Sequence, residues 1–385
     1  MKRVTLVTNM LPPYRVSFYR ALSRQVDFHL LLDTLTEFNR NWELPADAKE
    51  LKLTVQNCRS FVYSRYRGDV GYREKRQFHF SEQTIPMLRA LRPDVILSIE
   101  FGLKTLWSIF YGWLFHVPVI LLSEGTLHTE GHVGRLKRIL RRAIVSQCDR
   151  FWSNGPDSSE LLKSYGAEVS LIDEGMTGID TQDWHDSVQY QLSQRQDIRT
   201  KWNLKGRVLL FSGSLTPRKG IAPLLSAIEA WKGECAAFEF TLLLLGDGEE
   251  RSAVEEWRKR NPEIHVVMPG FVQPQDLPPF FAAADWAVLP TLDDNWPLAT
   301  LETLVAGLPQ LFSCYNGATS DLCQKETGVA FDPLNQQDFL RALREFQAAP
   351  EGRIPASIVS QISCYYSAEG QARRALGSIE KVLEW

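Results

Sequence analysis

The sequence lacks the cysteine spacings that mark disulfide-rich or metal-binding chains. Its six cysteines are scattered and form no CxxC pair; they are Cys58, Cys148, Cys235, Cys314, Cys323 and Cys364. This pattern indicates reduced thiols in a cytosolic protein rather than a disulfide framework or a zinc site. An excess of positive charge is also missing, because the net charge is −3. We therefore do not expect nucleic acid as a partner.

Long hydrophobic runs are missing as well. The opening segment MKRVTLVTNMLPPYR is basic and then apolar, but its apolar run is short, is broken by Thr8 and Asn9, and lacks a small-residue cleavage site. Residues 105–122, TLWSIFYGWLFHVPVILL, are interrupted by His116 and Pro118 and fall short of the roughly 18–20 clean apolar residues of a membrane span. We expect a first strand at the start, a buried helix and a buried strand within 105–122, and no transmembrane segment.

The chain instead shows a repeated alternation of strand and helix patterns. Its 385 residues suggest two domains. Short apolar runs recur in the first half (RVTLVT, DFHLLLD, DVILSIE, VPVILLS, DRFWS) and in the second (RVLLFSG, FTLLLLG, IHVVMPG, DWAVLPT, LPQLFSC). This alternation predicts two doubly wound α/β domains with parallel sheets, joined by a polar linker and entry helix at 181–206. Such sheets bind ligands at the carboxyl ends of their strands.

A candidate phosphate site lies in RVLLFSGSLTPRKGIAPLLSAIEAW, residues 207–231. A buried strand ends at Gly213 and a helix begins near Gly220, so Arg218 and Lys219 stand just before a helix amino terminus. The helix dipole is already positive there, so two cations at this place indicate a bound anion. The alternative is a pair of solvated surface charges. The loop does not fit the Walker pattern.

A second candidate segment is PTLDDNWPLATLETLVAGLP, residues 290–309. We expect an exposed Trp296–Pro297 pair to open a helix that Gly307 and Pro309 end. At about 100° per residue, Glu302 lies about 40° from Leu298, inside an apolar stripe. Burying a carboxylate there costs free energy unless a partner binds it. The alternative is that the CH₂ groups of Glu302 pack against the protein while its carboxylate stays in water. Both segments follow strands of the second domain, so both can reach one ligand. A ligand with phosphates that bind Arg218 and Lys219, and with hydroxyls that bind Asp294 and Glu302, is a nucleotide sugar.

These segments resemble a known family. GSLTPRKG resembles the phosphate-binding G-x-L-x-x-x-K-G loop of family-four glycosyltransferases of the GT-B fold, and DNWPLATLETLVAGLP resembles their E-x-F-[GP]-x-x-x-x-E-A-x-A-x-G-x-P segment. GDG at 246–248, GF at 270–271 and GIDT at 178–181 stand where that family has comparable strings. The resemblance implies an acceptor-side Rossmann-like domain at 1–180 and a nucleotide-sugar-binding one at 181–365, facing each other across a cleft. It also implies that a final helix, 366–385, returns to the first domain.

The resemblance also implies roles for individual residues. Arg218 and Lys219 would bind the donor diphosphate, Glu302 the ribose hydroxyls, and Asp294 the transferred sugar. Asp294 replaces a glutamate and is one methylene shorter. Further residues are candidates for donor binding, because their backbone could approach the donor closely, their N–H groups could bind it, or they could contact its ribose and base. They are Gly213, Ser214, Gly246, Phe271, Trp296, Pro297, Leu298 and Ala299.

Acceptor contacts are expected from the first domain. Tyr14 and Arg15 follow the first strand, in NMLPPYRVSFYRAL, where many relatives have a glycine-rich loop. Glu124 and His128 follow the strand VPVILLS, in EGTLHTEGH. His128 and His132 have a spacing that could suit a metal, but no clear third ligand accompanies them. We expect no metal and no cofactor.

The basic stretch GRLKRILRR, residues 134–142, interleaves apolar and cationic residues. It is either a solvated helix face or a site of peripheral docking on an anionic membrane.

Taken together, the residues and the resemblance predict a cytoplasmic, metal-independent, retaining glycosyltransferase, acting on a nucleotide-diphosphate sugar and a saccharide, glycolipid or other hydroxyl acceptor. Surface polysaccharide or glycolipid assembly is the expected setting. A nucleotide-sugar epimerase of the same fold and a non-catalytic two-domain sugar-binding protein are the alternatives.

Overall fold

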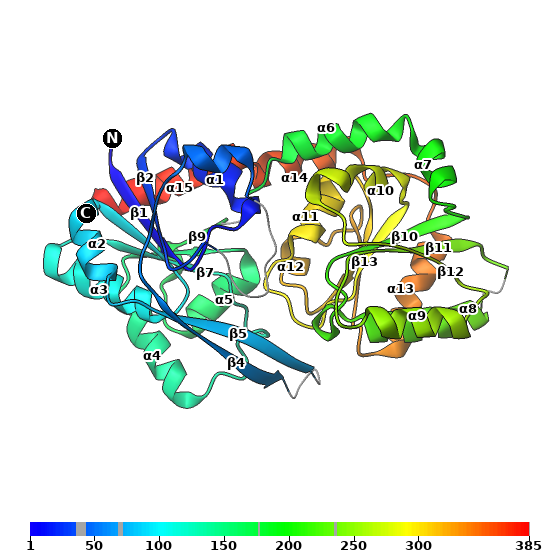
Figure 1. Cartoon of the computed structure of the whole chain (residues 1–385), viewed down its shortest axis with the longest axis horizontal. Coiled ribbons are helices and arrows are strands. Elements are labelled where there is room, and N and C mark those ends of the chain that lie inside the picture. The colour runs from blue at the N-terminus through cyan, green and yellow to red at the C-terminus, as the bar shows by residue number, and fades with distance from the viewer. Residues whose placement is uncertain (36–43, 68–71, 176–177, 235–236, 385) are drawn as a thin grey trace. The chain divides into compact units, whose positions relative to one another are not determined.

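A computed structural model describes the chain except residues 36–43, 68–71, 176–177, 235–236 and 385 (Figure 1). The chain divides into two compact units, which are Met1–Asp180 with Tyr365–Trp385, and Thr181–Cys364. We call them unit 1 and unit 2.

Unit 1 is built on a seven-stranded parallel sheet in the order β3-β2-β1-β6-β7-β8-β9. Its strands are β1 (Arg3–Thr8), β2 (Asp27–Leu32), β3 (Lys52–Val55), β6 (Val95–Ile99), β7 (Val119–Ser123), β8 (Arg150–Ser153) and β9 (Ile172–Glu174). Its helices are α1 (Val16–Ser23), α2 (Thr84–Leu91), α3 (Leu103–Phe115), α4 (Arg135–Val145), α5 (Pro156–Ser164) and α15 (Ala368–Leu383). The strand order reverses between β1 and β6, which is the point where doubly wound sheets bind ligands.

Unit 2 has a six-stranded parallel sheet in the order β12-β11-β10-β13-β14-β15, and its order reverses between β10 and β13. The strands are β10 (Arg207–Ser212), β11 (Phe240–Leu245), β12 (His265–Gly270), β13 (Trp286–Leu289), β14 (Gln310–Ser313) and β15 (Gly328–Phe331). The helices are α6 (Thr181–Leu192), α7 (Arg195–Lys201), α8 (Ile221–Glu234), α9 (Arg251–Arg260), α10 (Pro278–Ala283), α11 (Leu298–Val305), α12 (Thr319–Leu322), α13 (Gln336–Ala348) and α14 (Ala356–Tyr366).

Hydrophobic cores cover both faces of the unit 2 sheet. One core joins β10 and β11 to α8, α9 and α13, around the fully buried Trp231. The other joins the opposite side chains of the same strands to α6, α7 and α10. Strands buried on both faces read as continuous apolar runs, which is why the sequence predicted them.

Residues 181–206, predicted as a linker with an entry helix, are mostly helical. Trp184 and Val188 of α6, with Ile198 of α7, pack into the second core of unit 2. The prediction of a polar linker was wrong because a few large apolar residues, widely spaced among glutamines and aspartates, anchor both helices.

The final helix α15 packs on α1, and its residues Ala368, Ala372, Ala375 and Ile379 belong to the core of unit 1. Within unit 1, the β4–β5 hairpin, formed by antiparallel β4 (Arg59–Arg67) and β5 (Tyr72–Phe80), is a sheet of its own (Figure 1). The hairpin was not predicted from the sequence. Phe61, Val62 and Tyr63 are consecutive apolar residues that do not alternate with polar ones, and all three are exposed.

Helix α3 differs from the buried helix expected within 105–122. Its carboxyl-terminal half exposes Phe110, Trp113, Leu114 and Phe115, and Trp113 is 72% exposed. The strand that follows, β7, is buried as predicted. Within the described part of the chain, no helix combines the length and hydropathy needed to cross a bilayer.

Candidate functional site

The candidate donor site lies where the strand order of unit 2 reverses. Parallel strands β10 and β13 are neighbours, and their carboxyl ends lead into the loops 213–220 and 290–297. The first loop contains a 3₁₀ turn, Pro217–Lys219, directly before α8. The second ends at Pro297, the N-cap residue of α11. The structure therefore brings together the two segments that the sequence singled out.

Backbone contacts fasten these two loops to each other. The carbonyl of Arg218 accepts hydrogen bonds from Leu292 N (2.8 Å) and Thr291 Oγ1 (3.1 Å). Gly220 has φ +72°, and a Cβ there would lie 1.9 Å from the carbonyl oxygen of Pro290. Only glycine can take this conformation at this distance without strain. The position of Lys219 is thus fixed by the close approach of two backbones.

An ionic cluster of three residues forms the centre of the site. The Asp294 carboxylate pairs with Lys219 Nζ and, at 3.1 Å, with Arg218 Nη1. Arg218 also donates to the carbonyl of Asp293 at 2.7 Å. Burial by itself would raise the pKa of Asp294, but the charges and hydrogen bonds of Lys219 and Arg218 outweigh burial and lower it. Asp294 is therefore held as an ion.

The sequence predicted an anion beside Arg218 and Lys219, and the anion in this structure is Asp294. Two cations face one carboxylate, so the cluster keeps a positive charge. Arg218, with 32% of its side chain exposed, is more open to solvent than Lys219 at 16%. The arrangement can accept a further anion at low electrostatic cost.

Helix α11 turns one half-buried face outward, formed by Leu298, Ala299 and Glu302. The backbone N–H groups of Leu298 and Ala299 have no hydrogen-bond partner among the described residues. Free N–H groups at a helix amino terminus suit an anionic or hydroxyl-bearing ligand. Pro297 has no N–H and instead serves as the extended N-cap residue.

Trp296 and Pro297 are both buried, so the exposed pair expected here is not observed. Only 6% of the surface of Trp296 is exposed, and its indole Nε1 donates to Asp321 Oδ2 at 3.3 Å. An indole has a large apolar surface and a single donor, and the half-buried Asp321 supplies an acceptor for that donor while the ring is buried. Trp296 thereby anchors the start of α11, and its side chain faces the protein interior.

Glu302 is a carboxylate without a partner. Its side chain makes no hydrogen bond or ion pair with any described residue, although its backbone carbonyl accepts from Trp184 Nε1 at 2.8 Å. Burial raises the pKa of Glu302 to about 7. The buried side of α11 is formed by its neighbours, including Leu301 and Leu304. Glu302 therefore lies at the edge of the apolar stripe rather than inside it.

The other predicted donor residues follow adjacent strands of the same sheet. Gly246 N donates to Gly270 O at 2.9 Å, and a Cβ on Gly246 would lie 1.8 Å from Gly213 O. Ser214 is exposed, and the Phe271 ring, directly after β12, is 60% exposed. The loops after β10, β11 and β12 thus approach one another closely at Gly213, Gly246 and Gly270. The exposed ring of Phe271 lies directly after the last of these glycines.

In unit 1 the structure brings together Tyr14, Arg15 and Glu124 of the four predicted acceptor residues. Arg15, only 4% exposed, forms an ion pair with Glu124. The guanidinium of Arg15 lies 5.9 Å from the centre of the half-buried Tyr14 ring. His128 lies, half-buried, in the turn that follows Glu124.

Sequence reasoning missed Glu100 in this place. It follows β6 directly, has φ +64°, and its Oε1 accepts from Glu124 N at 2.7 Å. Burial, reinforced by the negative charge of Glu124, raises the pKa of Glu100 to about 7. A positive φ on a glutamate is uncommon and is a mark of functional sites. The available signal was a charged residue at the end of the buried run DVILSI, the same pattern that pointed to Glu124.

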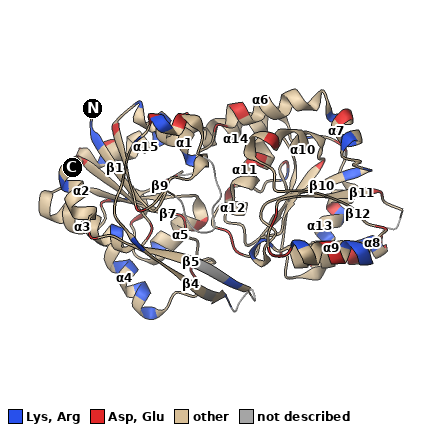
Figure 2. Cartoon of the chain, viewed as in Figure 1, with Lys and Arg blue, Asp and Glu red and all other residues tan. Residues whose placement is uncertain are grey.

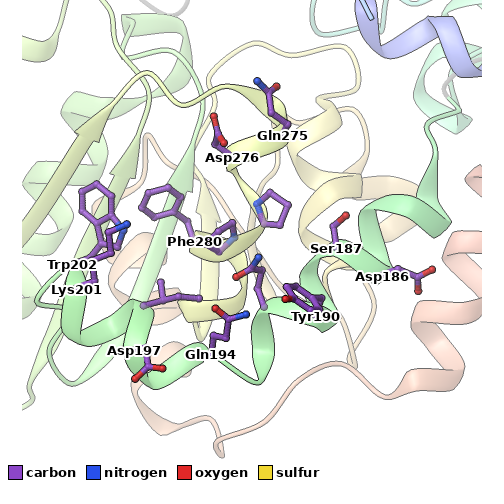
Figure 3. A pocket seen from close by; sticks show the side chains of 14 residues that line it. Asp186, Ser187, Tyr190, Gln194, Asp197, Lys201, Trp202, Gln275, Asp276 and Phe280 are labelled. Atoms are coloured by element: carbon purple, nitrogen blue, oxygen red, sulfur yellow. The ribbon is translucent and has the colours of Figure 1, made fainter. Parts of the chain in front are cut away.

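A separate groove of about 810 Å³ lies on unit 2, between α6, α7 and α10 (Figure 3). Its lining includes Tyr190, Trp202 and Phe280 with several amides and carboxylates. None of the predicted donor residues lines it.

Comparison with known proteins agrees with this arrangement. Residues 193–353 match the family model described as "Glycosyl transferases group 1". The chain is 23% identical over 326 residues to a D-inositol 3-phosphate glycosyltransferase of Pseudarthrobacter chlorophenolicus, covering 78% of this chain and 74% of that protein. It is 25% identical over 300 residues to the probable glycosyltransferase WbjE of Pseudomonas aeruginosa, covering 71% and 72%.

Two solved structures share the whole fold. Anabaena Alr3699/HepE in complex with UDP aligns with a TM-score of 0.71 and 14% identity, over 99% of this chain and 100% of that chain. The apo form of the lipopolysaccharide outer core galactosyltransferase WaaB aligns with a TM-score of 0.69 and 13% identity, over 99% and 100%. The architecture is that of two Rossmann-like domains of the GT-B type, as predicted. The chain carries a group 1 glycosyltransferase domain, which confirms the resemblance seen in the sequence.

The raised pKa of Glu302 generates a prediction about stability. The folded state holds the proton more tightly than the unfolded chain, whose glutamate has a pKa of 4.5. Stability is therefore lost as the pH rises from 4.5 through 7. Without ligand, Glu302→Gln should raise the free energy of unfolding at pH 8 by roughly 1–3 kcal/mol, and by much less at pH 5. Urea unfolding at both pH values checks this.

The same change at Glu256, which is exposed on α9, is the control and should alter stability by no more than about 0.5 kcal/mol. A Glu302→Gln variant that is no more stable than the wild type at pH 8 would show that the carboxylate is well solvated.

Proposed function

We propose that the chain is a retaining, metal-independent glycosyltransferase that moves a sugar from a nucleotide-diphosphate sugar to a hydroxyl group of a saccharide or glycolipid. The observation that carries this proposal is the arrangement around α11: two cations on Asp294, and the N–H groups of the helix start and the Glu302 carboxylate, which have no partner among the described residues. The relative HepE was solved with UDP and glucose, which supports a nucleotide sugar as donor. We place the activity in the cytoplasm, in surface polysaccharide or glycolipid assembly.

In the proposed complex the donor diphosphate lies against Arg218 and Lys219, and the N–H groups of Leu298 and Ala299 donate to phosphate or sugar oxygens. As the bond between the sugar carbon and the phosphate oxygen breaks, the electron pair passes to the diphosphate. The cations and helix terminus stabilise that developing charge. The acceptor oxygen attacks the same face of the sugar, and its proton passes to the leaving phosphate.

Glu302 is assigned to the ribose hydroxyls. An ionised carboxylate can accept two such hydrogen bonds, and these offset the free-energy cost of burying its charge. Ribose binding therefore favours the ionised form and lowers the pKa of Glu302. In unit 1, Arg15, Glu124 and Glu100 stand at the carboxyl edge of the sheet. We assign these residues, together with Tyr14 and His128, to acceptor hydroxyl groups.

Helix α4 supports peripheral contact with a membrane through residues 134–142. Its apolar side chains Leu136, Ile139 and Leu140 share one face of the helix and are 80%, 64% and 43% exposed. The helix also carries the exposed cations Arg135, Lys137, Arg138 and Arg142 (Figure 2). At about 100° per residue, Arg135 and Lys137 lie on the two sides of the apolar face. A helix that turns an apolar face to solvent and is rich in cations suits the interface of an anionic bilayer. Arg141 instead points inward, because it pairs with Glu130 at 2.6 Å.

The diphosphate assignment predicts the behaviour of a pair of variants. Lys219→Met should lower the free energy of unfolding by roughly 1–3 kcal/mol, because Asp294 then keeps only Arg218. Lys219→Met with Asp294→Asn should recover that stability. Both variants should bind the nucleoside diphosphate that most stabilises the wild type at least about tenfold more weakly, since a charge-assisted bond is worth about 1.5–3 kcal/mol.

Calorimetry with that nucleoside diphosphate separates the two effects, because the sugar that Asp294 would contact is absent from the ligand. Lys325→Met, at an exposed lysine of unit 2, is the matched control and should bind normally. Unchanged affinity in both Lys219→Met and Arg218→Ala would place the phosphate site elsewhere.

The mechanism predicts the stereochemistry and the metal requirement of transfer. Because the cations and the helix terminus neutralise the leaving diphosphate, transfer should continue in excess EDTA. Because the acceptor attacks on the face that the diphosphate leaves, the product should keep the anomeric configuration of the donor. Proton NMR of the early product reads the configuration directly. An inverted product would overturn the retaining assignment, and epimerised donor without transfer would favour a nucleotide-sugar epimerase.

The α4 surface predicts salt-sensitive binding to vesicles that contain an anionic phospholipid. Changing Lys137, Arg138 and Arg142 to Glu should weaken this binding at least about a hundredfold, since each cation near the surface contributes about 1 kcal/mol. The matched control changes Arg258, Lys259 and Arg260 of α9, all exposed, to Glu. If the wild type shows no salt-sensitive binding in a flotation assay, or if both triple variants lose it equally, α4 is not the docking element.

A further inference from the structure

Three metal-ligating side chains from separate parts of unit 1 converge beside the β4–β5 hairpin. Asp33 follows β2 directly, Cys58 precedes β4 directly, and His79 lies near the end of β5. One potential ligand atom of each residue lies within 4.8 Å of those of the other two. The residues are far apart in sequence and fit no metal-binding spacing, so this group could not be predicted from the sequence.

The three donors are a thiol, an imidazole and a carboxylate. This combination suits Zn²⁺, whereas Mg²⁺ and Ca²⁺ prefer sets made only of oxygen atoms. Tetrahedral zinc with bonds of about 2.0–2.3 Å holds its ligand atoms roughly 3.5 Å apart. Because the three donor atoms start within 4.8 Å of one another, each needs to move by no more than about 1 Å to reach that spacing, and a fourth position is left for water.

Outer partners already orient two of these side chains. His79 Nδ1 shares a hydrogen bond with Ser60 Oγ at 2.8 Å. Asp33 Oδ1 accepts from Gln56 Nε2 at 2.5 Å, and Gln56 in turn accepts from Thr84. Hydrogen bonds of this kind fix the tautomer of a ligating histidine and the orientation of a ligating carboxylate. Lys104 Nζ, 3.7 Å from Asp33 Oδ2, supplies the counter-charge when no metal is bound.

The hairpin has a structural need for such a group. A two-stranded hairpin is marginally stable in water without packing on one of its faces, and Phe61, Tyr63 and Tyr66 of β4 remain exposed. At its other end β4 is held by Arg67 Nη1, which donates to the carbonyl of Thr129 at 3.2 Å. Cys58 and His79 stand at the opposite end of the ribbon, where both strands join the body of unit 1.

We propose that Asp33, Cys58 and His79 bind one zinc ion, and that this ion fastens the base of the β4–β5 hairpin to the unit 1 sheet. The Cys58 thiol gives its proton to solvent as the zinc–sulfur bond forms. The proposal is independent of glycosyl transfer, because the ion is structural and holds residues of unit 1 alone.

The experiment uses the full-length, untagged protein, loaded with zinc and dialysed against metal-free buffer. We expect about one equivalent of zinc by elemental analysis in the wild type, and less than about a tenth of that in Cys58→Ser and His79→Gln. Cys323→Ser, at a half-buried cysteine of unit 2, is the matched control and should retain the zinc. Cobalt in place of zinc should give a thiolate-to-cobalt charge-transfer absorption in the wild type that Cys58→Ser lacks.

Limited proteolysis supplies the second readout. Chelation should accelerate cleavage within residues 59–80 of the wild type, whereas Cys58→Ser should be cleaved rapidly with or without chelator. Should Cys58→Ser fail to fold, His79→Gln and the cobalt spectrum of the wild type decide. A wild type without the thiolate absorption, or equal zinc retention by Cys58→Ser and Cys323→Ser, would overturn the proposal.

Discussion

The carboxylate of Asp294, held between Lys219 and Arg218, organises the carboxyl edge of the unit 2 sheet. It ties the loop after β10 to the loop after β13, and the close backbone contact at Gly220 sets the distance between them. Asp294 is in turn held from the other side, where its N–H donates to Tyr315 O and its carbonyl accepts from Gly317 N. Asn316 continues the support by donating to Thr300 Oγ1 in α11, at 2.9 Å. The helix that carries Glu302 is thus placed by the same connected set of contacts as the two cations.

Much of this framework could be predicted from the sequence because its strands are buried on both faces. The runs RVLLFSG and DWAVLPT coincide with β10 and β13, and glycines and charges that directly follow such runs must gather at one sheet edge. The β4–β5 hairpin could not be predicted in this way. Neither of its faces is buried throughout, so its sequence has no periodic apolar pattern, and its position depends on contacts such as Arg67 with Thr129.

The wrong predictions for individual residues have a common cause. The order of residues in the sequence does not show which groups an amphipathic side chain will contact in the folded protein. Trp296 was expected to be exposed beside Asp294, but its ring is buried and its indole N–H donates to Asp321. Helix α3 is apolar enough to be buried, yet Phe110, Trp113 and Leu114 in its carboxyl-terminal half are exposed. Arg141 belongs to a basic stretch but turns inward to Glu130. Glu100 was missed because only the structure reveals its positive φ and its bond to Glu124 N.

The two carboxylates of the donor segment experience opposite environments, and this contrast favours one kind of ligand. Paired cations lower the pKa of Asp294, whereas burial without a partner raises that of Glu302 to about 7. A diphosphate group can share the cations of Asp294, and ribose hydroxyls can supply the hydrogen bonds that Glu302 lacks. A free nucleoside would satisfy only Glu302, and a sugar phosphate only the cations. The cations and Glu302 lie on the same sheet edge and are joined by α11. A ligand that carries both a diphosphate and a ribose can therefore contact both places at the same time. The proposed nucleotide-diphosphate donor therefore gains binding energy at both places while losing its translational freedom a single time.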